Sequence, residues 1–335
     1  MPRKKPTMKD VAKLAGVTQP TVSYVINGTA SISEEVRERV YKAIEELNYK
    51  PNYNAVALKT QRTHTIGIVI ADITNAYYAH MVSLLEKELT RNGYLALIGS
   101  TGYKEAVEAE MIDRFLDHNV EAFIICYELG DPKCWEQLSE SGRKVITIEA
   151  GSAGEQFPGI RIDDYHGAYT ATRYLMEEGR KKIAYIGQNS AIEALQIREK
   201  GYREALEEAG DGREPLIYRT EGPGDKQTEG MEIGRKVAAE KDIDGIVVSS
   251  DELAVSMLKT LHSAGIRIPE EISVIGYDNI PLAALYNPGL TTVGQPLQET
   301  CTKAVEMLLH YLNGEEPESV VLKPELILRE TTLPS

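Results

Sequence analysis

Beyond residue 64 the chain alternates short apolar runs with longer stretches in which apolar residues recur at helical spacing. The apolar runs, each interpreted as a strand, cover residues 66–71, 94–99, 122–127, 145–149, 182–187, 245–250 and 272–277. The helical patterns cover residues 77–92, 104–118, 133–141, 165–178, 193–209, 227–240, 252–264 and 297–312. Strands that alternate with helices predict parallel sheets with helices on both faces.

Two such series follow one another, which predicts an α/β body of two Rossmann-like lobes, each with its own sheet. The break lies near residues 160–164, where one series ends and the next begins. The apolar run 289–293 and the last helix would return the chain to the first lobe. We therefore expect one lobe made of residues 64–162 and 291–322, and a second made of residues 163–290 and 323–335.

The first 48 residues show the pattern of an all-α head. Thr7 can cap a first helix, with Asp10 returning the bond as in a capping box, and Gly16 supplies the sharp turn that follows. Thr18 can cap the second helix, and Pro20 occupies its first turn, where no intrahelical N–H is required. Apolar residues at helical spacing would form the core of this head: Met8, Val11, Ala12, Leu14, Ala15, Val22, Val25, Ile26, Val36, Val40, Ala43, Ile44 and Leu47.

Two helices joined by a tight turn are typical of a DNA-reading helix-turn-helix, whose second helix enters the major groove. Residues 1–63 carry 11 Lys/Arg against 6 Asp/Glu, a net charge of +5, although the whole chain carries −14. The rest therefore carries −19, and a basic head on an acidic body confines phosphate contacts to one end. An ordinary three-helix packing unit is the alternative. A solvated charge run explains Arg3, Lys4 and Lys5 but not this segregation.

Length and composition narrow the class of protein further. A chain of 335 residues with 42% hydrophobic content can hold two sizeable cores and a small head. No stretch approaches the ~20 apolar residues of a membrane span, and no apolar segment of a secretory signal follows the basic N-terminus. The three cysteines and six histidines are scattered, without zinc-ligand or disulfide spacing. We therefore expect a cytoplasmic protein that uses no membrane, metal or cofactor.

Catalysis is the first rival hypothesis. The sequence has no GxxxxGK phosphate loop, no GxGxxG fingerprint after a strand and no HExxH motif. The GSAG stretch at residues 151–154 lacks the spacing of a nucleophile elbow and is interpreted as a loop. We therefore do not expect an enzyme.

Head, linker and body together resemble the lactose-repressor/galactose-repressor family of bacterial transcription regulators, over essentially the whole chain. The resemblance rests on DVAKLAGVTQPTVSYVIN (10–27), ELNYKPN (46–52), IREKGYREAL (197–206), SSDELA (249–254), VIGYDN (274–279) and LTTVGQP (290–296). It implies a body of the periplasmic-binding-protein type I, whose two lobes close on a small molecule. It also implies a homodimer, in some relatives a tetramer, that binds a pseudo-palindromic operator in double-stranded DNA.

Within that family, matching positions in the head would contact DNA. The positions at base edges are Gln19, Pro20 and Tyr24, and those at phosphates are Thr18, Thr21, Ser23 and Asn27. Many relatives carry Arg at the position of Tyr24. Arg reads guanine bidentately, whereas a phenol offers one hydroxyl and an apolar contact, so no relative's operator sequence transfers. A plain surface aromatic is the alternative for Tyr24.

Residues 49–63 form a linker, in which the step from Lys50 to Pro51 disfavours helix continuation. By resemblance, residues 54–58 match a hinge helix that forms when two subunits meet on DNA. Ala55 would let the two hinge helices approach each other, and Leu58 would be the wedge that enters the minor groove and kinks the duplex. Packing of Leu58 against the body is the alternative.

The resemblance also implies an effector cleft between the lobes, lined by Asn75, Tyr77, Tyr78, Arg198, Ser250, Asp278 and Gln295. Arg and carboxylate groups fork onto neighbouring hydroxyls and rings cover apolar faces, so this set suits a hydroxyl-rich ligand. Two features depart from sugar-responsive relatives: Ser250 replaces a common Asn, and residues 220–225 lack an aromatic side chain. Tyr77 and Tyr78 are alternatively aromatics that fill a core, and Arg198 is alternatively a residue that packs within the protein.

We therefore expect a homodimeric transcription regulator that represses a carbohydrate-use operon and is released from its operator by a sugar-type effector. Ligand would close the lobes, separate the hinge helices and lower the affinity for DNA. A corepressor such as a nucleobase would reverse the sign, and a phosphorylated phosphocarrier protein would change the partner. A sugar-binding protein serving a transporter is a further alternative, opposed by the head and by the missing export signal.

Overall fold

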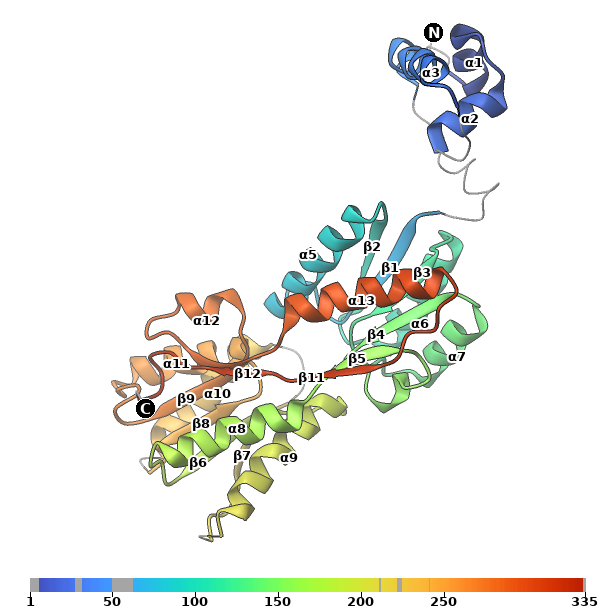
Figure 1. Ribbon diagram of the computed structural model, residues 1–335. Coiled ribbons are helices and arrows are strands. Elements are labelled where there is room, and N and C mark those ends of the chain that lie inside the picture. Colours follow the sequence, from blue (N-terminus) through green and yellow to red (C-terminus); the bar gives the residue numbers. More distant parts are fainter. Residues whose placement is uncertain are drawn as a thin grey trace. The chain divides into compact units, whose positions relative to one another are not determined.

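The structure is a computed structural model that describes residues 6–27, 32–49, 63–210, 212–221, 225–240 and 242–333, with the backbone alone at Asn27 (Figure 1). The chain divides into two compact units, residues 1–63 and residues 64–335. The expected hinge residues Ala55 and Leu58 lie outside the described residues. No helix in the described ranges is long and apolar enough to cross a membrane.

The first unit contains the expected three helices, α1 (Met8–Ala15), α2 (Gln19–Asn27) and α3 (Glu34–Leu47). Both bonds of the capping box form: the Asp10 amide donates to the Thr7 hydroxyl and the Thr7 amide donates to the Asp10 carboxylate. Gly16 ends α1 with φ 66°, in the left-handed region that glycine adopts without strain. The helices bury a small shared core: Val11, Ala12, Ala15, Val22, Val25, Val40, Ala43 and Tyr49.

One residue that the sequence pattern predicts in the core of the head lies at the surface instead. Leu14 is 46% exposed, whereas Ala15, its neighbour along the chain, is buried. Successive helix residues point about 100° apart, so the face of α1 that Val11 and Ala15 share leaves Leu14 at the surface. The apolar stripe of α1 is therefore narrower than the sequence pattern predicts.

The first lobe of the second unit is a six-stranded parallel sheet, in the order β11-β5-β4-β3-β1-β2. Its strands are β1 (Thr65–Ile70), β2 (Leu95–Ser100), β3 (Ala122–Ile125), β4 (Lys144–Ile148), β5 (Gly159–Ile162) and β11 (Val320–Leu322). Its helices are α5 (Ala76–Arg91), α6 (Glu105–Asp117), α7 (Pro132–Glu140) and α13 (Leu297–Leu312), with a 3₁₀ turn at Ser152–Gly154. Apolar side chains of α5 and α13 bury one face of the sheet, and those of α6 and α7 bury the other.

The second lobe is also six-stranded, in the order β12-β10-β9-β8-β6-β7, and β12 is its antiparallel strand. The strands are β6 (Ile183–Gln188), β7 (Leu216–Thr220), β8 (Gly245–Val248), β9 (Ser273–Asp278), β10 (Thr291–Gly294) and β12 (Glu325–Ile327). The helices are α8 (Asp164–Glu177), α9 (Glu193–Glu208), α10 (Lys226–Ala239), α11 (Asp251–Ser263) and α12 (Pro281–Leu285). Helices α8 and α9 pack on one face, and α10 and α11 on the other.

The chain passes between the lobes at three places in the described range: after β5, after β10 and between β11 and β12. Figure 1 shows β11 and β12 as one run that leaves the first sheet and joins the second. The boundary expected at residue 291 needs correction, because Thr291–Gly294 pairs with β9 and β12 in the second sheet. The return to the first lobe therefore begins only at α13.

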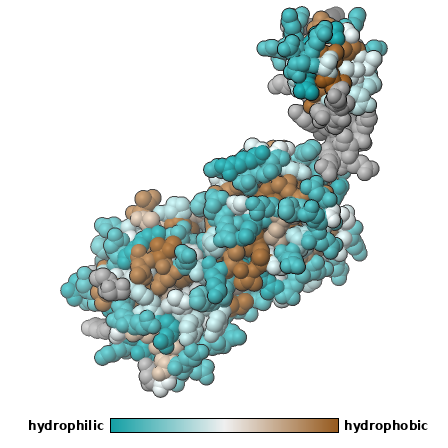
Figure 2. Space-filling model, in the orientation of Figure 1, coloured by the Kyte–Doolittle hydropathy of each residue, from teal (hydrophilic) through white to brown (hydrophobic). Residues whose placement is uncertain are grey.

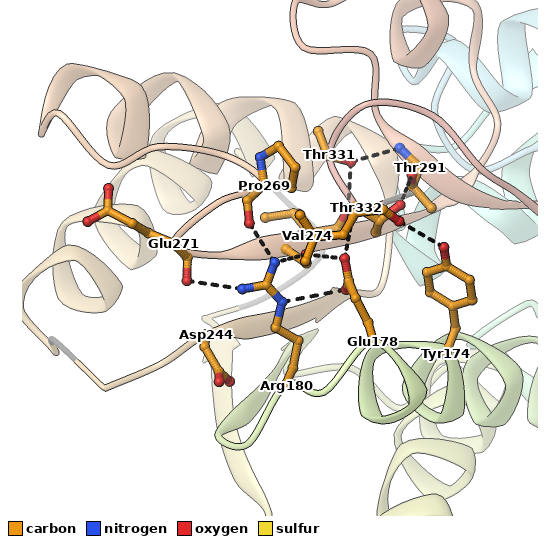
Figure 3. A network of polar contacts seen from close by, with 12 residues as sticks. Tyr174, Glu178, Arg180, Asp244, Pro269, Glu271, Val274, Thr291, Thr331 and Thr332 are labelled. Atoms are coloured by element: carbon orange, nitrogen blue, oxygen red, sulfur yellow. Dashed lines mark hydrogen bonds and ion pairs between the residues drawn. The ribbon is translucent and has the colours of Figure 1, made fainter. Parts of the chain in front are cut away.

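A buried polar network anchors the last described residues to the second lobe (Figure 3). Beyond the C-terminal end of α8, Nη2 of Arg180 donates to the Pro269 carbonyl at 2.5 Å and to the Ser273 hydroxyl at 2.7 Å. The Glu178 carboxylate accepts from the same Ser273 hydroxyl at 2.9 Å and lies 3.5 Å from Nε of Arg180. The Leu333 amide also donates to the Glu178 carboxylate, and the Tyr174 hydroxyl donates to the Leu333 carbonyl at 3.1 Å. Buried charges are tolerated when they are paired and bonded in this way, so the network holds the last described residue against the second lobe.

Candidate functional site

The head presents the outer face of α2 as a polar surface. Gln19, Pro20 and Tyr24 are exposed there, and Tyr24 is 46% exposed. The hydroxyls of Thr18 and Thr21 lie 2.8 Å apart, and the Thr21 amide donates to the Thr18 hydroxyl, which begins the helix. Residues on this face are free to meet a partner molecule because the opposite face, through Val22 and Val25, fills the core of the head.

The body brings together all seven residues predicted for the cleft. One pocket between the lobes is lined by Asn75, Tyr77, Tyr78, Arg198, Ser250, Asp278 and Gln295. They come from the start of α5 in the first lobe, from α9, α11 and the end of β9 in the second, and from the segment that joins β10 to α13. In parallel α/β sheets, ligands bind outside the carboxyl ends of the strands, which is where these residues gather.

Arg198 lines the second lobe's side of the pocket and is only 7% exposed. Its Nε donates to the Asp164 carboxylate at 2.6 Å and its Nη1 donates to the Ser249 carbonyl at 2.8 Å. Its guanidinium also lies over the Tyr277 ring, 3.7 Å from the centroid. A buried charge needs such compensation, so Arg198 is positioned by the protein as well as available to a ligand.

A hydrogen-bonded chain links the walls of the pocket. The Tyr77 hydroxyl donates to Oε1 of Gln295 at 2.8 Å, and Nε2 of Gln295 donates to Oδ1 of Asp278 at 2.8 Å. Tyr77 lies in the first turn of α5 in the first lobe, whereas Asp278 is the last residue of β9 in the second. Tyr77 is therefore neither a free ligand contact nor only a core aromatic, because its hydroxyl couples the two lobes.

Two carboxyl groups of the pocket are held in unusual states. Burial raises the pKa of Asp278 to about 6, against the opposing effect of Arg198. Burial and then the neighbouring Asp164 raise the pKa of Glu149 well above its ordinary value. Glu149 and Asp278 also have positive φ, 55° and 112°, which non-glycine residues rarely adopt. Such strain and pKa shifts concentrate at functional sites.

Sequence reasoning missed several residues that line the same pocket, among them Tyr103, Tyr127, Glu128, Glu149 and Lys226. Four of them follow β2, β3 or β4, at the carboxyl ends where such pockets form, and that position is the signal that could have found them. Lys226 is the first residue of α10. It follows residues 220–225, in which many sugar-responsive relatives carry an aromatic residue that this chain lacks. Nothing else in the sequence there indicated that Lys226 lines the pocket.

The lobes lie close together around this pocket. Its cavity measures about 80 Å³, whereas ligand pockets generally enclose about 300–1,000 Å³. The Glu128 carboxylate of the first lobe accepts from the Glu193 amide at the start of α9, at 2.8 Å, across the gap between lobes. No group of three or more metal-ligating side chains occurs among the described residues. The arrangement is suited to enclosing a small polar molecule, with rings and two carboxyl groups on the first lobe's wall and mainly charged and hydroxyl groups on the second lobe's wall.

Comparison with known families gives two matches along the chain. Residues 7–52 match "Bacterial regulatory proteins, lacI family", and residues 172–332 match "Periplasmic binding protein-like domain". The HTH-type transcriptional repressor PurR of Vibrio atlanticus (strain LGP32) is 35% identical over 331 residues, which are 97% of this chain and 98% of the relative.

Solved structures are similar over nearly the whole length. A complex of the transcriptional regulator CelR with cellobiose shares 29% identity with a TM-score of 0.71, over 97% of this chain and 99% of that one. The lac repressor dimer bound to operator and to the anti-inducer ONPF has a TM-score of 0.85 at 24% identity, over 99% of this chain and 100% of that one. The second likeness concerns the fold alone.

Proposed function

The chain belongs to the lacI family of bacterial regulatory proteins, and from this we propose that it represses transcription of carbohydrate-use genes in response to a hydroxyl-rich effector. The observation that carries the effector part of the proposal is the convergence of seven expected side chains, from both lobes, on one pocket. A head with an exposed polar helix face and a body with an inter-lobe pocket are the two sites that such a regulator needs.

For the DNA site, we propose that α2 enters the major groove, with Gln19, Pro20 and Tyr24 at base edges. The positive charge of the first 63 residues supports this role, because phosphate contacts supply most of the affinity. Thr18 and Thr21, beside each other at the start of α2, would donate to phosphates and fix the register.

For the effector site, we propose a sugar or a related polyol. Asp278 and Arg198 offer an acceptor and donors side by side, with Nη1 of Arg198 3.7 Å from Oδ1 of Asp278. Such a pair would form hydrogen bonds with neighbouring hydroxyls of the ligand, and the rings of Tyr77 and Tyr78 would contact an apolar face of the ligand. The CelR complex contains cellobiose, and this likeness also supports a sugar-type ligand here.

The mechanism would be linkage between the two sites. Effector enters while the lobes are apart, replaces protein contacts such as Tyr77 with Gln295, and stabilises a different lobe arrangement. A shift of the first lobe would then separate the two hinge segments of a dimer and lower operator affinity. By thermodynamic reciprocity, bound operator would weaken effector binding by the same factor.

Two exposed apolar surfaces support a homodimer. β2 is an edge strand with Leu95 and Ile98 exposed, and α12 exposes Leu282 and Leu285. Figure 2 shows hydrophobic side chains gathered at the surface over α12. Unpaired edge strands and apolar patches mark interfaces, since a monomer would leave them in contact with water.

The test is selection of bound DNA from a random pool, followed by titration of the selected site with candidate effectors. We expect an inverted repeat with half-sites about one helical turn apart, because a two-fold dimer presents its recognition helices at that spacing. A sugar should lower the affinity for that site. An unsymmetric motif or no enrichment contradicts the dimeric regulator, and a ligand that raises the affinity indicates a corepressor.

A further inference from the structure

Lys226 is a buried cation in the pocket wall with little compensation from the protein. It begins α10, lines the pocket and is 9% exposed. Its ammonium makes no hydrogen bond within the described part of the chain, and its ion pair there is with Glu252, at 3.7 Å. An ammonium carries three donors, and leaving them unpaired in a buried place is costly.

Two hydroxyls of the same wall are also without partners. The Ser249 and Ser250 side chains are almost fully buried, and neither hydroxyl oxygen has a hydrogen-bond partner among the residues that the structure describes. Both residues line the pocket beside Lys226, at the turn from β8 into α11. Buried polar groups in native proteins are nearly always satisfied, so two unpaired hydroxyls beside an ammonium that has one distant ion pair indicate acceptors supplied by a bound molecule.

The charges around Lys226 restrict what that molecule can be. Three carboxyl side chains line the pocket, Glu128, Glu149 and Asp278. The two lining cations, Arg198 and Lys226, already face the carboxylates of Asp164 and Glu252. Arg198 also lies 3.7 Å from Asp278, so a phosphate or carboxylate on the ligand would enter beside carboxyl groups while the neighbouring cations are already paired, at a cost that burial increases.

Building on the proposed effector function, we propose that Lys226 is a specificity-determining residue: its ammonium donates hydrogen bonds to a hydroxyl oxygen of an uncharged polyol. Ser249 and Ser250 bind neighbouring oxygens of the same ligand, and anionic derivatives of that polyol are rejected. The buried ammonium therefore lowers the stability of the ligand-free protein but is in position to bind the ligand, a trade-off between function and stability.

The first experiment needs no ligand. Lys226→Met keeps the aliphatic stem and removes the buried charge, so its melting temperature should equal or exceed that of the wild type. Lys236→Met, an exposed site on the same helix, is the matched control. A melting temperature clearly below both would make Lys226 a structural partner of Glu252 and overturn the proposal.

The second experiment uses a thermal-shift panel of neutral pentoses, hexoses and disaccharides, together with the 6-phosphates and uronates of the same hexoses. We expect a neutral member to bind and its anionic counterparts to bind far more weakly. Lys226→Met should lose about tenfold to a hundredfold in affinity for that member, as expected for a hydrogen bond to a charged group. Lys236→Met should bind it as the wild type does.

Deoxy analogues of the bound sugar then identify the contact. The analogue that lacks the hydroxyl held by Lys226 should bind the wild type weakly, yet bind Lys226→Met as well as the parent sugar does, because the two losses share one interaction. Additive losses for every analogue, preference for an anionic member, or no binding by any panel member would each overturn the proposal. Operator binding, measured separately without ligand, shows whether the regulator function itself fails.

Discussion

At the scale of single residues, Arg198 combines two demands. Its guanidinium faces the pocket, yet it is also paired with the buried Asp164 carboxylate and stacked on Tyr277. The truncation of one partner in a buried pair leaves the other charge without compensation, which costs more than the pair contributes. We therefore expect a variant at this position to change the stability of the fold as well as the affinity for the proposed effector.

We predict that Arg198→Ala lowers the free energy of unfolding by about 3–5 kcal/mol, because Asp164 stays buried without its partner. Urea denaturation measures the change. Arg203→Ala is the control, since Arg203 lies on the same helix and its pair with Glu199 is exposed. Equal effects of the two substitutions would show that the Asp164 pair carries no special weight.

A pH dependence follows from Asp278. Its pKa of about 6 exceeds the unfolded value of about 3.9, so the native state binds more protons between these pH values. The stability from this group is present below pH ~4 and is lost as pH rises through about 6. Burial also raises the pKa of Glu149 and, to about 8, that of Asp251, so these groups add to the same decline. We predict that Asp278→Asn makes the decline between pH ~4 and 6 shallower, as followed by urea denaturation at several pH values.

Asp242 provides a control of opposite sign. A hydrogen bond from Lys182 lowers the pKa of Asp242, so its contribution is present at neutral pH and is lost as pH falls. Asp242→Asn should therefore leave the decline between pH 4 and 6 in place. If wild type and Asp278→Asn lose stability in parallel over that interval, Asp278 is not the group responsible.

At the scale of elements, sequence patterns predicted the long helices and the buried strands of both lobes, because their periodicity extends over many residues. They missed β5, β7, β11, β12 and α12, which are three to five residues long. A strand of three residues shows no reliable alternation, and β11 forms because residues 159–162 lie beside it. Pairing over such sequence distances is a tertiary effect that local pattern does not contain.

The candidate site was predictable to a similar extent. All seven residues taken from the family resemblance line the pocket, because that resemblance carries positional information. The resemblance did not indicate Lys226, since it pointed only to an aromatic side chain in the preceding residues 220–225. It also did not show that Arg198 and Tyr77 are bound to other protein groups, which only their packing reveals.

The C-terminal segment offers a test of one element's attachment (Figure 3). The buried Thr331 hydroxyl accepts from the Thr291 amide at 2.8 Å and donates to the Val274 carbonyl at 2.7 Å. Thr331→Val keeps the shape but removes both bonds, and should cost about 2 kcal/mol or more in chemical denaturation. Thr302→Val, on the surface of α13, should change little. Equal losses of stability in the two variants would contradict this attachment.

At the scale of the whole molecule, the exposed apolar residues predict how the protein assembles. Leu285 on α12 is 80% exposed. We predict that Leu285→Lys shifts the protein toward monomer in analytical ultracentrifugation, while the melting temperature of the monomer changes little. Burying a lysine charge in an apolar interface is unfavourable unless it finds a partner.

The control for this prediction lies on the far edge of the first sheet. Val321 on β11 is also exposed, and it lies at the opposite edge from β2. Val321→Lys should therefore leave the sedimentation coefficient unchanged. Monomers from both variants would mean that the loss reflects general damage, and dimers from both would place the interface elsewhere.

The passage of the chain between the lobes also bears on how the protein is made. The first sheet gains its edge strand β11 only at residues 320–322, whereas the head is complete within the first 63 residues. At a synthesis rate of about 5–20 residues per second, a ribosome takes roughly 10 to 50 seconds to cover that interval. During this time the nascent chain carries the whole sequence of the head, while the first sheet still lacks its edge strand. We expect a chain released before residue 295 to contact DNA phosphates through its head without responding to the proposed effector, because it lacks Gln295 of the pocket wall.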